Sequence, residues 1–157
     1  MKTTKRELNL AETAYCPSST VRRVARLITS LYDSELRPAG LRATGLTILV
    51  AITKAQPSAI GALANELLLD PTTMTRSLQV LQKQGLIAIS PRSSHRQRFV
   101  SLEPKGRRAL IRAIPVWRRV QARLVGAIGA DFWNTLEREL GRIERAAIEL
   151  MKAGISS

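Results

Sequence analysis

A strongly capped helix followed at once by two short strand signals restricts most narrowly what this chain can fold into. Asp70 and Pro71 predict the start of the helix, because Asp is a favourable N-cap and Pro suits the first helical position, where its missing N–H would be unpaired anyway. Gly85 predicts the end of the helix. Strand signals at 86–89 and 98–102 stand on either side of a polar, basic segment, which predicts a hairpin with a cationic tip.

Three helical signals precede this pattern. Apolar residues at helical spacing predict a first helix, which one of the hydroxyl residues 18–20 caps and which ends before Gly40. Thr44 is expected to cap a second helix that is apolar nearly all round and therefore buried. Ser58 is expected to begin a third, short helix.

The last third of the chain is expected to form two more helices. The first runs from Pro104 to Ile128, and Pro115 inside it removes one backbone hydrogen bond and predicts a kink. Gly129 separates this helix from a last one, which Asp131 is expected to cap. Three short helices followed by a hairpin make a winged helix-turn-helix, so the predicted fold is mainly α with a small β-hairpin wing.

Positive charge is concentrated in the same part of the chain. The net charge is +13, and the 38 residues from Pro71 to Arg108 carry eight Lys and Arg against a single acid, Glu103. After its cap, the helix that starts at Asp70 presents hydroxyl, amide and cationic groups without a carboxylate. Concentrated positive charge favours a polyanionic partner, although a merely solvated basic face has the same composition. The order of the elements favours DNA.

In a winged helix-turn-helix, the second helix of the motif enters the major groove of double-stranded DNA and its first residues reach base edges. The hairpin lies along the flanking duplex, where arginines contact phosphates or a narrow minor groove. We therefore expect DNA contacts from the following residues of the motif and hairpin: Ser58, Pro71, Thr72, Thr73, Thr75, Arg76, Gln79, Arg92, His95, Arg96 and Arg98.

Composition excludes several other classes of protein. With 157 residues, of which 45% are hydrophobic, the chain can bury a core without a metal or a disulfide. No apolar run reaches the roughly 18 residues of a membrane span, and the first residues lack the apolar region of a secretory signal. A single Cys fits a reducing cytoplasm. One His and one Cys give no metal site, no cofactor site and no recognisable catalytic site, so we do not expect an enzyme.

Four blocks of the sequence together resemble the MarR family of transcriptional regulators. They are residues 58–67, 69–76, 81–86 and 101–107, and their order and spacing match the family throughout. The resemblance extends less specifically over about residues 18–150. It implies a repressor that binds a palindromic operator and is released by a small ligand, often a phenolic or other aromatic acid.

The resemblance also implies a homodimer, in which the first and last helices and part of the long helix interlock with a second chain. The apolar stripes of the first and last helices lie far apart in the sequence, and they independently need a shared partner. We therefore expect an N-terminal extension over 1–17, a DNA-binding winged helix-turn-helix domain over 41–103, and a helical dimerisation region over 18–40 and 104–153.

Three positions depart from the family pattern. Ser94 stands where the family's wing usually has an Asp that pairs with an Arg, here Arg96. Leu68 replaces a frequent Gly in the turn before the DNA-reading helix, so this turn is expected to form without a positive φ. Glu103 replaces a Thr that often caps the long helix.

Candidate effector residues are Tyr32, Trp117 and Phe132, although aromatic residues at helical spacing are also typical of a core. One branch of the family senses hydroperoxides through a cysteine near the first helix, which makes a redox-sensing repressor based on Cys16 an alternative, with an inert thiol as the plainer interpretation. A non-specific architectural DNA-binding protein and a protein-interaction module remain further alternatives.

Overall fold

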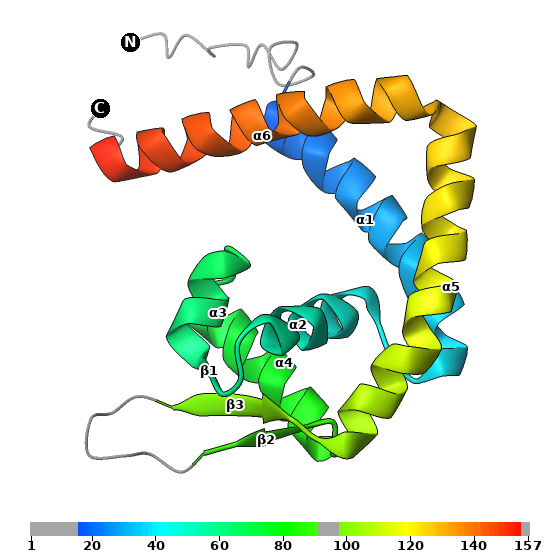
Figure 1. Cartoon of the computed structure of the whole chain (residues 1–157). Coiled ribbons are helices and arrows are strands. Elements are labelled where there is room, and N and C mark those ends of the chain that lie inside the picture. The colour runs from blue at the N-terminus through cyan, green and yellow to red at the C-terminus, as the bar shows by residue number, and fades with distance from the viewer. Residues whose placement is uncertain (1–15, 91–97, 155–157) are drawn as a thin grey trace, which may run out of the picture. The chain divides into compact units, whose positions relative to one another are not determined.

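The computed structural model describes residues 16–90 and 98–154. Its elements follow in the order α1 Pro17–Leu36, the short helix η2 Arg37–Ala39, α2 Ala43–Lys54, β1 Ser58–Ala59, α3 Ile60–Glu66, α4 Pro71–Lys83, β2 Ile87–Ile89, β3 Phe99–Leu102, α5 Pro104–Ile128 and α6 Ala130–Ala153 (Figure 1). The predicted fold class, mainly α with a small β-hairpin wing, is confirmed. The chain divides after Ala113 into two compact units, and each is described by itself.

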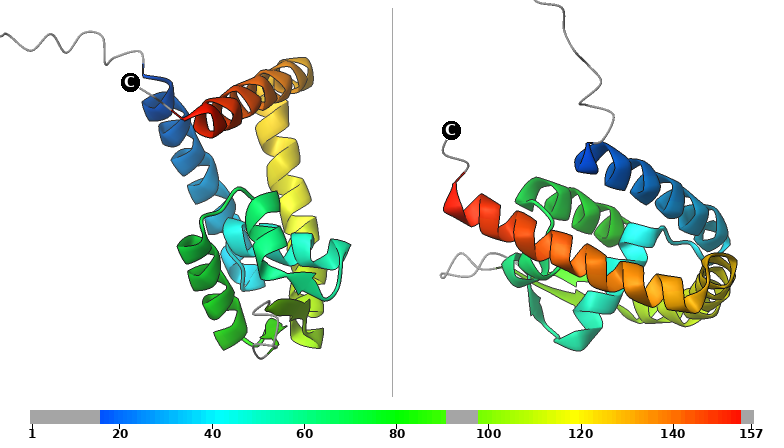
Figure 2. Two further views of the ribbon diagram at one scale, coloured as in Figure 1. Left: turned by 90° about the vertical axis from the view of Figure 1, so that its left-hand side faces the viewer. Right: turned by 90° about the horizontal axis from the view of Figure 1, so that it is seen from above.

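The core of the first unit lies where α2, α3 and α4 pack on one another and on the sheet (Figure 2). Helix α2 is apolar on most sides and supplies the centre of this core, as its sequence predicts. The largest fully buried side chains of the described residues come from four elements, α1, α2, α4 and β3: Leu36, Ile48, Leu49, Ile52, Met74, Leu78 and Val100. Burying apolar surface of this kind is the main stabilising contribution to a domain of this size.

A three-stranded antiparallel sheet has the order β1-β3-β2. The expected hairpin of β2 and β3 is present, with Ile87 opposite Leu102. The expectation that Ser58 begins the third helix is wrong, because Ser58 lies in β1 opposite Val100, and α3 begins at Ile60. A two-residue strand has no periodicity that a sequence could reveal, and it forms because the free edge of β3 offers unpaired backbone groups.

Three predicted helix caps are also wrong. Helix α1 begins at Pro17, so residues 18–20 lie within its first turn instead of before it. Helix α2 has Arg42 at its N-cap, and Thr44 lies inside the helix. The side chain of Asp33, on α1, takes the role expected of Thr44, because its Oδ1 accepts the backbone N–H of Ala43 at 2.7 Å. Helix α6 follows Gly129, and Asp131 lies in its first turn.

The turn between α3 and α4 contradicts the expectation that Leu68 avoids a positive φ. Leu68 has φ +49°, so the turn keeps the left-handed conformation for which glycine is the usual residue. Its side chain is exposed, so nothing in the core compensates for the cost of this conformation, which is about 1–2 kcal/mol for a residue with a Cβ.

The second unit consists of α5 from residue 114 onward and α6. Helix α6 has no buried residue, although it carries an apolar stripe. Its exposed large apolar side chains are Phe132, Leu140, Ile143, Leu150 and Met151. None of the helices in the described ranges has the length and hydropathy that crossing a membrane requires.

Gly106 holds the start of α5 against the sheet, and this contact yields a stability prediction. A Cβ at Gly106 would overlap the carbonyl oxygen of Leu86 and lie 2.8 Å from Cδ1 of Leu102. That carbonyl already accepts the backbone N–H of Glu103 at 3.0 Å and cannot move freely. We expect Gly106→Ala to lower the free energy of unfolding by about 1–3 kcal/mol, as overpacking does.

The matched control is Gly61→Ala in α3, because nothing lies within 4 Å of a Cβ at that position. It should raise the free energy of unfolding by up to about 1 kcal/mol, since alanine is the better helix former. Chemical denaturation of the two variants provides the measurement. Equal stability of both variants would contradict the close contact of α5 with the sheet.

Candidate nucleic-acid interface

Helix α4 is fixed at both ends by its own sequence. Asp70 is its N-cap, as predicted, and Oδ1 accepts the backbone N–H groups of Thr72 at 3.0 Å and Thr73 at 2.9 Å. Gly85 follows the helix with φ +69°. Nζ of Lys105, from α5, donates to the carbonyl oxygen of Gln84 at 2.7 Å, where a cation suits the negative end of the helix.

The cap also gives Asp70 an unusual acidity. The hydroxyl of Thr73 donates to its carboxylate, and with the backbone N–H groups of Thr73 and Thr72 this hydrogen bonding holds the pKa of Asp70 below its ordinary value. Each of these donors stabilises the ionised form. The hydrogen-bond acceptors of the charged carboxylate are thus used by the first turn of α4.

One side of α4 is buried, and this fixes which side chains face outward. Met74, Leu78 and Leu81 are buried against the core. At 100° per residue, the line farthest from them carries Thr72, Arg76, Gln79 and Lys83, all of which are exposed. Apart from the cap, no residue of α4 is acidic. This outward line presents hydrogen-bonding and cationic groups without a competing anion.

Two of the candidate threonines have hydroxyls that are already engaged. Thr73 Oγ1 donates to Oδ2 of Asp70, and Thr75 Oγ1 donates to the carbonyl oxygen of Pro71 at 2.7 Å. Both side chains therefore offer a methyl group and a remaining acceptor lone pair to a partner, but not a free hydroxyl proton. Thr72 makes no side-chain hydrogen bond within the described residues, so its hydroxyl can donate outward.

The sheet brings the base of the wing to the side of α4. The backbone carbonyl of Arg98 accepts the N–H of Ile60 at 3.0 Å, so β1 ties the start of β3 to the start of α3. A hollow of about 100 Å³ separates this strand from α4, and Arg98 lines it together with Thr75, Gln79 and Gln82. Gln82 belongs to this group although it is not among the predicted contacts. Gln82 lies beside Arg98 because the tertiary structure brings α4 next to the start of β3, and no local pattern in the sequence indicates this proximity.

The other predicted contacts have different positions. Ser58 is only 6% exposed, and its hydroxyl donates to the backbone carbonyls of Ala55 and Ile52, so it has no surface to offer a partner. Pro71 is exposed at the first position of α4. The predicted contacts of the wing tip, Arg92, His95 and Arg96, lie outside the described residues, as does Ser94.

The candidate effector and redox residues belong to different parts of the chain. Tyr32 belongs to the first unit and is buried, which raises the pKa of its phenol above the ordinary value. Trp117 and Phe132 belong to the second unit and are exposed. Cys16 is the half-buried N-cap residue of α1 and a free thiol. Among residues 16–90 and 98–154, no three His, Cys, Asp or Glu side chains gather as metal ligands do.

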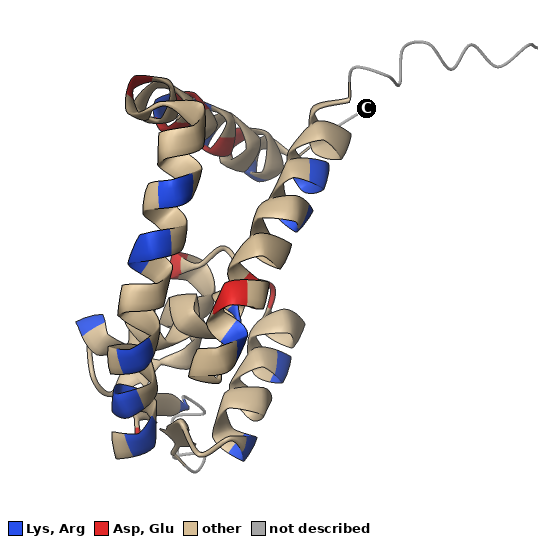
Figure 3. Cartoon of the chain, turned by 90° about the vertical axis from the view of Figure 1, so that its right-hand side faces the viewer, with Lys and Arg blue, Asp and Glu red and all other residues tan. Residues whose placement is uncertain are grey.

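Positive charge is spread over several helices of the first unit. Lys and Arg positions mark α1, α4 and the first turns of α5 (Figure 3). Of the described acids in the first unit, Glu66 pairs with Lys54 at 2.5 Å, and Asp33 and Asp70 are engaged at the helix starts described above. A polyanion that approaches α4 therefore meets cations with few free carboxylates between them.

Comparison with solved structures relates this geometry to DNA-binding proteins. The transcriptional regulator MosR from M. tuberculosis, in a crystal structure with DNA, is 34% identical over 85% of this chain and 97% of that chain, with a TM-score of 0.78. A transcriptional regulator (MarR family) from Rhodococcus sp. RHA1 is 21% identical over 79% and 89%, with a TM-score of 0.68. The PcaV transcriptional regulator from Streptomyces coelicolor, in complex with its natural ligand, is 18% identical over 94% and 99%, with a TM-score of 0.75. No family model and no curated protein matches the sequence.

The cap of α4 predicts a pH-dependent contribution to stability. Because the pKa of Asp70 is lowered in the folded state, its contribution is fully present above the unfolded value of about 3.9 and is lost as the pH falls through the folded pKa. We expect Asp70→Ala to lower the midpoint of thermal unfolding at neutral pH, and its difference from the wild type to shrink below pH 4.

Asp70→Asn is the control, because asparagine also caps helices but does not titrate. It should keep most of the stability at neutral pH and lose the acid-dependent part. An Asp70→Ala variant that unfolds like the wild type at every pH would contradict the assignment of the cap.

Proposed function

Because the chain belongs to the MarR family of winged-helix, DNA-binding transcriptional regulators, we propose that it is a sequence-specific repressor. It binds a palindromic operator as a homodimer, and a small ligand releases it. The acid-free outward face of α4, with Arg98 beside it, supports the DNA-reading part of this proposal most directly.

In this proposal α4 reads the major groove. Arg76 lies on its outward line and can donate two hydrogen bonds to the O6 and N7 atoms of a guanine, whereas Gln79 suits an adenine. Thr72 donates to a base edge or a phosphate, and the methyl groups of Thr73 and Thr75 suit the methyl group of thymine.

The wing contacts the flanking duplex. The cationic side chain of Arg98, at its base, binds a backbone phosphate and adds affinity without sequence preference. The tip residues Arg92, His95 and Arg96 remain predicted contacts of the same kind.

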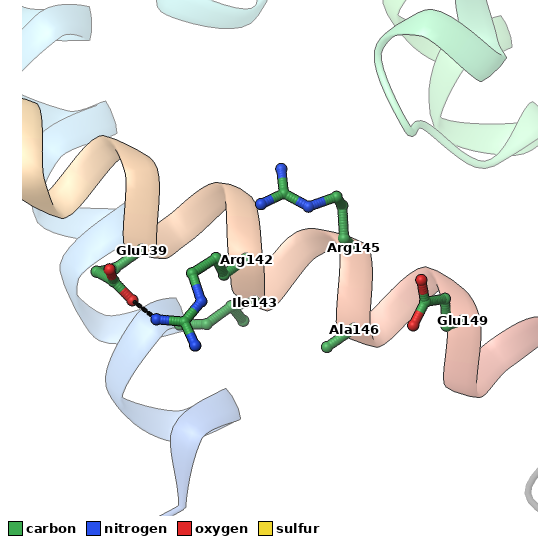
Figure 4. A pocket seen from close by; sticks show the side chains of 6 residues that line it. All are labelled: Glu139, Arg142, Ile143, Arg145, Ala146 and Glu149. Atoms are coloured by element: carbon green, nitrogen blue, oxygen red, sulfur yellow. Dashed lines mark hydrogen bonds and ion pairs between the residues drawn. The ribbon is translucent and has the colours of Figure 1, made fainter.

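The proposed homodimer accounts for apolar surface that would otherwise face water. Val21, Val24 and Leu27 of α1 are exposed, and no residue of α6 is buried. On α6, Ile143 and Ala146 lie among four charged side chains, of which Glu139 and Arg142 form an ion pair at 2.8 Å (Figure 4). An apolar strip with charges of both signs suits a second copy of the same helix, because a two-fold interface must be self-complementary.

These helices lie in the proposed dimerisation region, residues 18–40 and 104–153, whereas residues 41–103 form the proposed DNA-binding domain.

The proposed ligand is a small organic acid. Trp117 and Phe132 of the second unit expose aromatic surface on which such a molecule can stack, and Tyr32, a buried residue of the first unit, stays a predicted effector residue. The fold is shared with PcaV, whose crystal structure contains its natural ligand.

Two arginine variants test the DNA-reading proposal. Arg76→Ala should lower affinity for the operator by about 1–3 kcal/mol, roughly 5- to 150-fold, and leave the affinity for unrelated duplexes much less changed, because it removes base contacts. Arg98→Ala should weaken both affinities alike and reduce the slope of log affinity against log salt by about one. Fluorescence anisotropy at several salt concentrations measures both effects.

An operator found by footprinting should contain two half-sites about one helical turn apart. Uniform protection of unrelated duplexes would favour a non-specific architectural protein instead, and unchanged DNA binding by both variants would show that α4 is not the reader.

The dimer proposal is tested at Ile143, which is 52% exposed. Ile143→Glu places a charge in the proposed interface without disturbing a core, so the variant should sediment as a monomer, remain helical, and lose operator affinity at least tenfold. Val80→Glu is the matched control, because Val80 is 56% exposed but lies on α4. It should remain a dimer while it binds DNA poorly. Wild-type sedimentation of Ile143→Glu would contradict this interface.

A further inference from the structure

A second and larger hollow lies on the side of α4 that faces away from the wing. Its volume is about 740 Å³, and α4 contributes Thr73, Ser77, Val80 and Gln84 to it. The opposite wall consists of η2 and the start of α2, where Arg37, Arg42 and Thr44 line the hollow. None of the residues that line this hollow is acidic. All of these residues belong to the first unit.

The two hollows flank the outward line of α4. At 100° per residue, Thr75, Gln79 and Gln82 lie on the wing side, and Thr73, Ser77, Val80 and Gln84 lie on the other side. A helix with its side chains measures about 10–12 Å across and fills a major groove about 12 Å wide. When α4 occupies that groove, the walls of the two hollows therefore face the two sugar-phosphate backbones.

The far wall is held in place by buried anchors. Leu36 and Leu41 are buried on either side of the turn, and the N–H of Gly40, with φ +80°, donates to the carbonyl oxygen of Arg37 at 2.9 Å. The hydrogen bond from the N–H of Ala43 to Asp33 fixes the start of α2 next to Arg42. The backbone at Arg37 and Arg42 is thus held in place in the protein without a bound partner.

The charges of this wall are available. Arg37 and Arg42 are exposed, and neither forms an ion pair within the described part of the chain. The neighbouring Asp33 accepts the backbone N–H of Ala43 through Oδ1, and its carboxylate forms no ion pair with either arginine within the described residues. Thr44, exposed in the first turn of α2, adds a hydroxyl next to the two guanidinium groups.

We infer that Arg37 and Arg42 form a second phosphate-binding wall, which grips the DNA backbone on the side of α4 opposite Arg98. This inference rests on the proposed function, in which α4 reads the major groove. The helix then lies between two cationic walls, one for each strand of the duplex. Because phosphates carry no base identity, this wall adds affinity and orientation instead of sequence preference.

The test is the double variant Arg37→Ala/Arg42→Ala, with binding to an operator and to an unrelated duplex measured at several salt concentrations. Affinity for both duplexes should fall by the same factor, at least tenfold, and the salt slope should decrease by about two. Arg37→Lys/Arg42→Lys should keep most of the salt slope, because a phosphate contact needs the positive charge more than the guanidinium shape.

Arg22→Ala/Arg23→Ala is the matched control. It removes the same charge from α1, about 20 Å along the helix from Arg37, and should leave the salt slope unchanged. Thermal unfolding and sedimentation of all variants verify that fold and dimer are intact.

If the Arg37→Ala/Arg42→Ala variant keeps the wild-type salt slope while Arg98→Ala lowers it, this inference is overturned and the proposed function stands. Loss of operator affinity alone would also overturn it, because the arginines would then act on sequence reading. If that variant keeps its salt slope but loses a thermal shift caused by benzoate, the hollow binds a small organic anion instead, which overturns the inference as well. Failure of the proposed function is a different result, namely unchanged binding by both Arg76→Ala and Arg98→Ala.

Discussion

The burial of one side of α4 is the constraint on which the rest of the interface depends. Met74, Leu78 and Leu81 are held in the core, so the helix cannot rotate about its axis without losing apolar burial. Its opposite line, with Thr72 and Arg76, is therefore presented outward in one orientation. The cap at Asp70 fixes where the helix begins, and this sets how far that line reaches.

The walls beside α4 come from distant parts of the sequence, and each is fixed by backbone hydrogen bonds. On one side, the N–H of Ile60 ties Arg98 to the start of α3. On the other side, Asp33 binds the first N–H of α2 and holds Arg42 next to α4. A rigid setting of this kind reduces the conformational entropy lost on binding, which favours affinity. The exposed apolar side chains of α1 and α6 are the surface that the proposed dimer would cover.

Sequence reasoning succeeded where structure is local. The long apolar periodicities predicted the helices, the Asp70-Pro71 pair predicted the start of α4, and the two strand signals predicted the hairpin. It failed where a partner distant in the sequence decides. Thr44 was expected to cap α2, but Asp33 of α1 binds that helix start. Ser58 was expected in a helix, but pairing with Val100 draws it into a strand and buries it.

The sequence by itself determined the fold class, the position of α4 and most of its polar face, because helical periodicity and capping act over four or five residues. Only the tertiary structure decided which cations stand beside that helix. Arg37 and Arg42 lie about thirty residues before α4 and outside the charge-dense segment, and no local rule connects them to it. Long-range packing does so, because α2 packs against α4 and this places the turn between α1 and α2 on the far side of the hollow.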